Sequence, residues 1–224
     1  MCFNAITSFY IFLISFGLSS FLFYRGIKEN NKNFIINSII SFLISFMQCI
    51  EFFIWKNNKC NLFNHYLSLS IITLLFLQPT ITGCVYLYLS NIKFNLLYFY
   101  LSFTMFLYIL FFIYLFNYLF TKNICAKSYP NISRLEWGAF KFLRKENNDL
   151  NIIFHLFYFF IIFLILFIDK IENTKLFNYY GISFLLLSFI TIYLFTFISN
   201  KTNTFSSLWC FYAIFYPLIC LFTV

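Results

Sequence analysis

Long apolar runs alternate with short polar breaks along this chain, and seven of the runs have the length of a membrane span. A spanning helix needs about 20 mainly apolar residues. The qualifying runs are Phe3–Tyr24, Asn33–Trp55, Leu62–Ser90, Asn95–Phe120, Ile152–Ile168, Leu176–Ser199 and Phe205–Val224. Strands of a membrane barrel instead alternate apolar and polar residues over about ten positions. We therefore expect an all-α bundle of seven transmembrane helices that forms one domain over residues 1–224.

The longest polar break, residues 121–150, mixes apolar and basic side chains in the stretch SRLEWGAFKFLRK. Ser133 and Glu136 have the spacing of a capping box. This spacing predicts a short interfacial helix, with Trp137 at the depth of the lipid headgroups. Gly138 weakens a helix at this point, so a small hairpin is the alternative.

Composition supports an exterior that faces lipid. Hydrophobic residues make up 62% of the chain and charged residues only 10%, whereas soluble domains carry about 25% charged residues. The net charge of +8 comes from basic residues in the polar breaks. Nucleic-acid binding would require a solvated basic domain, which the chain lacks. The lipid bilayer is therefore the expected partner.

Charges, sequons and cysteines bear on the orientation. We call the membrane face that holds the N-terminus side A, and the opposite face side B. Side A carries nine of the 15 basic residues, but six of these nine lie in the one loop 121–150. Without this loop side B carries more basic residues than side A. The flanks of the first helix also favour side B as the cytoplasmic face. Sequons at Asn131 and Asn200 lie on side A, as do Cys60 and Cys125, which can pair in an oxidising compartment.

These features together predict an N-terminus outside the cytoplasm and a C-terminus inside it.

An acid within the second apolar run is the most unusual position of the sequence. Gln48, Glu51 and Trp55 lie on one helix face, with Glu51 about one turn below side A at the ~1.5 Å rise per residue of a helix. Three interpretations stay open for Glu51: an interfacial acid that reaches water, an acid that faces the bundle interior, and a hydrogen-bond anchor between helices.

The residues able to contact Glu51 lie at a similar depth on side A. They are His65 at the start of the third run, Trp209 at the start of the seventh, and Trp137 in the loop above. This grouping predicts a polar vestibule that opens on side A. A histidine at a loop end is more often a satisfied structural residue, and the two histidines of the chain have no metal-ligand spacing. We expect neither a metal nor a cofactor.

The stretch LQPTITG places a proline near the middle of the third run. Pro79 removes a backbone donor and should bend the helix, which leaves the carbonyl of Leu75 for Gln78, a threonine or water to satisfy. The bend is either purely structural or a binding point at which a broken helix lines a cavity, as in transporters. Pro217 has the same potential in the seventh run.

Known seven-helix classes fit poorly. The third run ends in YLYLSN instead of an acid-Arg-Tyr triplet, and the seventh has neither Asn-Pro-x-x-Tyr nor a lysine for retinal. The stretches MQCIEFFIW and SSLWCFYAIFYP resemble an uncharacterised seven-helix family of giant viruses and microbial eukaryotes. The resemblance covers about two helices and implies the seven-helix fold, but no activity.

Two classes of function follow. The first is a transporter- or channel-like protein, with Gln48, Glu51 and Gln78 lining a cavity for a small molecule or ion. The second is a receptor-like or membrane-remodelling protein that binds a protein partner through the loop 121–150. An enzyme ranks third, because Cys210 with His65 is the only candidate pair of nucleophile and base.

Overall fold

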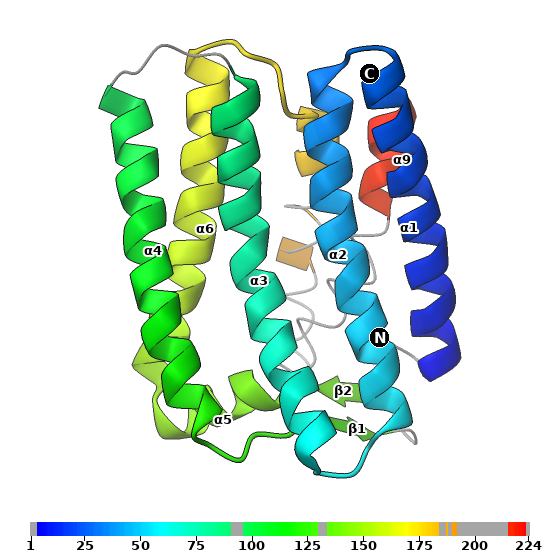
Figure 1. The fold of residues 1–224 in the computed structure, drawn as a ribbon, viewed down its shortest axis with the longest axis vertical. Helices are drawn as coiled ribbons and strands as arrows, with labels where there is room; N and C mark the ends of the chain where they lie inside the picture. The colour runs from blue at the N-terminus through cyan, green and yellow to red at the C-terminus, as the bar shows by residue number, and fades with distance from the viewer. Residues whose placement is uncertain are drawn as a thin grey trace.

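The computed structural model of the chain describes residues 4–90, 96–129, 134–183, 187, 190–191 and 215–222. Long helices stand side by side within these residues (Figure 1). Five of the described helices are long and apolar enough to cross a membrane, namely α1 (Ala5–Lys28), α2 (Lys32–Lys56), α3 (Leu62–Leu89), α4 (Leu96–Phe120) and α6 (Asn148–Ile171). The described part also contains α5 (Gly138–Glu146), α9 (Phe215–Phe222), β1 (Lys127–Tyr129) and β2 (Arg134–Glu136).

The first five apolar runs of the sequence form these five long helices, so the prediction of a helical, membrane-compatible fold is confirmed. The sixth run, Leu176–Ser199, lies largely outside the described residues. Of the seventh, Phe205–Val224, the structure describes only α9. Seven spans are therefore not confirmed.

Asparagines in the polar breaks determine where four of the long helices begin. Asn4, Asn31, Asn61 and Asn147 are the N-caps of α1, α2, α3 and α6, and the side chain of each accepts a backbone N–H from the first helical turn. Asparagine is among the best N-cap residues because its side-chain oxygen satisfies a donor that the helix itself leaves free. The Asn-rich breaks thus start the helices as well as separate them.

α1 and α2 form a close pair that rests on small residues (Figure 1). Ser8, Ser15 and Ser19 are buried along α1, and the hydroxyls of Ser15 and Ser19 donate to carbonyls one turn earlier. A Cβ added to Gly26 would lie 2.8 Å from Cγ1 of Ile35. Small residues let helix backbones approach closely, which is the usual basis of helix packing in lipid.

α3 is the central helix, with α2 on one side and α4 and α6 on the other (Figure 1). It buries Ile71, Ile72 and Tyr86 completely, whereas α4 exposes Phe106 and Tyr114. Large exposed aromatic surfaces are costly in water but suit contact with hydrocarbon. α4 therefore presents the kind of surface expected against the lipid bilayer.

The break between α4 and α6 contains both structures that the sequence offered as alternatives, a small hairpin and a short helix. A hairpin pairs Lys127 with Glu136, and α5 follows (Figure 1). The predicted capping box is wrong, because α5 begins at Gly138 and Glu136 lies in β2. Gly138 has a packing role: an added Cβ would lie 2.3 Å from the backbone carbonyl of Cys125. We call residues 122–129 and 134–146 the side A cap.

Candidate functional site

Glu51 lies inside the bundle, under the side A cap. Its side chain is 0% exposed, and Nε1 of Trp137 donates a hydrogen bond to its Oε1 over 3.1 Å. The interpretation of an interfacial acid that reaches water is therefore wrong. Trp137 itself is 5% exposed and turns toward the protein instead of the headgroups. Ile54, one turn after Glu51 on the same face of α2, is also buried.

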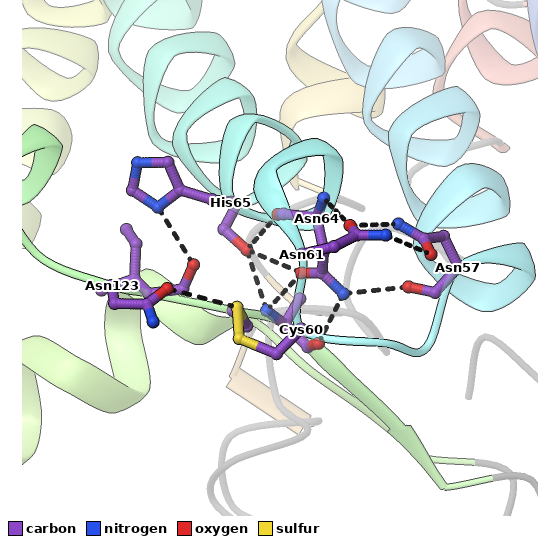
Figure 2. The surroundings of a disulfide bond; sticks show 10 residues. Asn57, Cys60, Asn61, Asn64, His65 and Asn123 are labelled. Atoms are coloured by element: carbon purple, nitrogen blue, oxygen red, sulfur yellow. Dashed lines mark hydrogen bonds between the residues drawn. A yellow bond between two sulfur atoms is a disulfide. The ribbon is translucent and has the colours of Figure 1, made fainter.

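A disulfide between Cys60 and Cys125 fastens the cap to the start of α3 (Figure 2). Their Cα atoms are 5.5 Å apart, and the bond joins the α2–α3 connection to the segment that enters β1. Cys125 is the residue against which Gly138 packs. The disulfide thus holds the strand-to-helix corner that places Trp137 over Glu51.

Two asparagine side chains hold the same segment by pairing with its backbone. Nδ2 of Asn64 donates to the carbonyl of Ala126 over 3.0 Å, and the N–H of Ala126 donates back to Oδ1 over 2.8 Å. Asn58 repeats the arrangement with Ser128, at 3.1 and 2.9 Å. Asn64 is completely buried, and a buried backbone group that lacks a partner is costly. Each side-chain amide therefore pairs with the backbone of the cap as a neighbouring β-strand would, through one donated and one accepted hydrogen bond.

His65 points to the cap and not to the acid. Its Nδ1 lies 3.2 Å from the carbonyl of Ile124 (Figure 2), and no hydrogen bond joins His65 to Glu51 within the part of the chain that the structure describes. Trp209 and the sequons at Asn131 and Asn200 lie outside the described residues. The structure thus brings Trp137 to Glu51 and leaves His65 as a satisfied loop-end histidine.

Gln78 lies in the middle of α3, beside Pro79, and its partner is on another helix. The hydroxyl of Tyr158, on α6, donates to Oε1 of Gln78 over 2.8 Å. Thr80 donates to the carbonyl of Phe76, one turn earlier. The polar groups around the proline are therefore used both within α3 and between helices. Pro217 lies in the first described turn of α9, so its predicted bend is at the edge of the described residues.

A cavity of about 90 Å³ lies beside this pair. Its lining residues come from α2, α3, α6, α9 and the segment between α6 and α9, and they are Ile40, Ile44, Gln78, Thr82, Tyr158, Phe159, Ile162, Phe163, Ile165, Leu166, Phe177, Ile182 and Tyr216. Gln48 and Glu51 are not among them. The prediction of one cavity shared by Gln48, Glu51 and Gln78 is therefore wrong for this cavity, which contains Gln78 alone.

A buried acid at side B escaped the sequence analysis. Asp169, in the last turn of α6, is 0% exposed. Its Oδ1 accepts the N–H of Leu176 over 3.0 Å and the hydroxyl of Thr174, and its Oδ2 accepts the hydroxyl of Tyr179 over 2.6 Å. The predicted span ended at Ile168, which made Asp169 look like a loop residue. The available signal was an acid directly after an apolar run, followed by hydroxyl residues.

Asn37 extends the polar side B end to α2 and α9. Its Nδ2 donates to the carbonyls of Asn33 and Leu176 over 2.7 and 3.2 Å, and its Oδ1 accepts the hydroxyl of Tyr216. The expectation that polar chemistry gathers in the side A half is therefore wrong. A helix-by-helix search misses Asn37 because its distant partners lie 139 and 179 residues further along the chain.

No group of three or more His, Cys, Asp or Glu side chains that could hold a metal ion occurs in the part of the chain described by the structure. Comparisons with protein-family models, curated proteins and solved structures give no match.

Proposed function

We propose that this chain is a multi-pass, transporter-like membrane protein that carries a small neutral molecule through the cavity beside Gln78. The observation that carries the proposal is the hydrogen bond from Tyr158 to Gln78 in a mainly apolar wall, next to Pro79. Ligand sites are typically apolar with a few placed polar groups. Discontinuous helices at mid-membrane depth often form such sites in transporters.

The lining favours a neutral substrate over an ion. Among the cavity-lining residues that the structure describes, no side chain is charged, and the polar ones are an amide and three hydroxyls, on Gln78, Thr82, Tyr158 and Tyr216. Ion pathways use rings of charged side chains or of backbone carbonyls. A solute with one hydrogen-bonding group and an apolar body is complementary to this wall.

The size of the cavity fits a closed form of such a carrier. Its volume of about 90 Å³ lies below the roughly 300 Å³ of a typical small-molecule site. Passage therefore requires movement of the helices around it. Pro79 supplies a weak point, because helices bend sharply at proline.

Side A is extracytoplasmic in this proposal, and the chain crosses the membrane seven times. The disulfide between Cys60 and Cys125 supports this orientation, because disulfides persist in oxidising compartments and are rare in the cytosol. The far end of α9 lies at the same end of the bundle as the α1–α2 turn (Figure 1), which agrees with a cytoplasmic C-terminus. Membership of the resembled seven-helix family stays part of the proposal and adds no activity.

Cysteine accessibility tests the transport path. The background replaces the cysteines outside the disulfide by serine or alanine, and Thr82→Cys then places a thiol in the cavity wall. In sealed vesicles we expect a membrane-impermeant thiol reagent to label Thr82→Cys from at least one side. Ser102→Cys, on the exposed face of α4, should stay unlabelled. A Thr82→Cys thiol that reacts from neither side contradicts a water-accessible path.

The alternative is a receptor-like or membrane-remodelling protein that binds a partner through the cap. The disulfide and the two asparagine pairings favour it, because they give the cap one fixed shape outside the membrane. Lys122, Lys127 and Lys145 are exposed on the cap, so the partner would be acidic. Thr82→Cys labelling separates the two functions, because cap binding needs no path through the bundle.

A further inference from the structure

The side B end of α6 carries a polar pocket that the proposed transport path does not use. Its volume is about 370 Å³, and it is lined by Asn33, Asp169, Lys170, Asn173, Lys175, Phe177, Asn178, Tyr179 and Tyr180. Two exposed lysines from the last turn of α6 and the following loop stand on its wall. The pocket therefore combines positive charge with amide and hydroxyl donors at the level where a helix leaves the membrane.

An apolar groove of about 600 Å³ runs along α6 from this pocket. Its lining residues are Phe160, Phe163, Leu164, Leu166, Phe167, Lys170 and Tyr179. Lys170 and Tyr179 line both the groove and the polar pocket, so the two spaces adjoin. Phe167 and Phe160 precede Lys170 in α6 by about one and three turns, which is the direction of the bilayer interior.

The charge in the pocket is positive despite the acid in its wall. The Asp169 carboxylate is 0% exposed and accepts three hydrogen bonds from its own loop, so it is satisfied internally. Neither Lys170 nor Lys175 takes part in an ion pair with another residue that the structure describes. A negatively charged ligand would provide the missing counter-charge.

The loop that carries Lys175 is held in one conformation before any ligand binds. Asn173 and Lys175 have φ angles of 50° and 53°, in the left-handed region that non-glycine residues rarely adopt. The N–H of Leu176 is bound to Asp169, and the carbonyl of Lys175 accepts Nδ2 of Asn33. Both bonds are made by the peptide group that follows Lys175, and the N–H of Thr174, on the preceding side, donates to the carbonyl of Asp169 over 3.2 Å.

From these observations we propose that the side B end of α6 binds an anionic phospholipid. One acyl chain lies in the groove along Phe160, Leu164 and Phe167, and the phosphate lies between Lys170 and Lys175. Basic pockets at the ends of transmembrane helices are suited to anionic headgroups. The site shares Phe163, Leu166 and Phe177 with the wall of the cavity beside Gln78. Its two lysines line no described part of that cavity, so the site goes beyond the proposed transport.

The test uses the full-length protein in detergent micelles, titrated with phosphatidylglycerol or phosphatidylcholine and read by native mass spectrometry. Near a membrane surface a lysine contributes roughly 1 kcal/mol, or about fivefold, to the binding of anionic lipid. We therefore expect Lys170→Ala and Lys175→Ala each to weaken phosphatidylglycerol binding about fivefold. Lys28→Ala, an exposed side B lysine outside the pocket, should leave it unchanged.

Equal affinity for the two lipids, or an equal loss in Lys28→Ala, would overturn the site. The groove has its own matched pair: Phe167→Ser should weaken phosphatidylglycerol binding severalfold, whereas Phe106→Ser on α4 should not, and both side chains are 55% exposed. Glycerol phosphate serves as the probe for the headgroup alone. If it displaces phosphatidylglycerol at equal concentration, the phosphate binds without the chain and the lipid assignment is wrong.

Discussion

At side A the bundle is closed by a covalent bond and by side-chain amides that pair with backbone, whereas at side B it is closed by hydrogen bonds around one carboxylate. The side A cap is joined through Cys60 and Cys125 and through Asn64. The side B turn depends on Asp169 and Asn37. A disulfide opens only by reduction, but hydrogen bonds exchange with water or with a ligand. From this difference we expect side B to open more readily than side A.

The disulfide should carry the largest single share of stability in this comparison. It joins residues 65 positions apart, and removal of a native disulfide typically costs about 2–5 kcal/mol. We expect Cys60→Ala to lower the unfolding temperature in detergent more than any other change discussed below. Cys84→Ala, at an exposed free cysteine, is the matched control. A Cys60→Ala protein as stable as Cys84→Ala would remove the contrast between the two ends.

Loss of the side B carboxylate should have the next largest effect. Asp169→Asn keeps one acceptor oxygen for Thr174 and Leu176 but removes the charged acceptor of the Tyr179 hydroxyl, and one bond to a charged group contributes about 1.5–3 kcal/mol. We expect a lower unfolding temperature together with faster hydrogen exchange at the N–H of Leu176. Glu146→Gln, on the exposed surface of α5, provides the control. Slower or unchanged exchange would show that Asp169 does not hold the turn.

Trp137→Phe tests the cap without breaking its covalent bond. The change removes the indole donor of Glu51, and a buried acceptor that loses a partner costs about 1–3 kcal/mol. Trp55→Phe is a close control, because the buried Nε1 of Trp55 has no hydrogen-bond partner in the structure as described. We therefore expect Trp137→Phe to have a lower unfolding temperature than Trp55→Phe. The reverse order would mean that the Trp137–Glu51 bond does not stabilise the cap.

Tyr158→Phe should give the smallest effect on stability. It removes one neutral hydrogen bond to Gln78, which contributes about 0.5–1.5 kcal/mol. The removed hydroxyl belongs to the cavity wall, so the accessibility of Thr82→Cys should change more than the unfolding temperature. Tyr180→Phe, at an exposed tyrosine away from this cavity, should alter neither. A stability loss as large as that of Asp169→Asn would indicate that the pair is a structural anchor.

The sequence predicts the long helices well, because each is specified by its own apolar run and four of the five begin at an asparagine cap. For Glu51 the sequence leaves three interpretations open, and the burial of its side chain against Trp137 in the fold decides among them. The sequence misses Asp169 and Asn37, whose roles depend on residues brought near only by the fold. Gly138 illustrates the same limit: read alone it weakens a helix, but next to Cys125 it allows a contact that no other residue permits.

The bond between Cys60 and Cys125 encloses α3 and α4 in a covalent ring, with α1 and α2 as one tail and the segment from the cap onward as the other. With side A in an oxidising compartment, as proposed above, Cys125 reaches that compartment only after α3 and α4 have inserted, so we expect insertion to precede closure of the ring. A single protease cut between α3 and α4 would then leave two pieces that separate only after reduction.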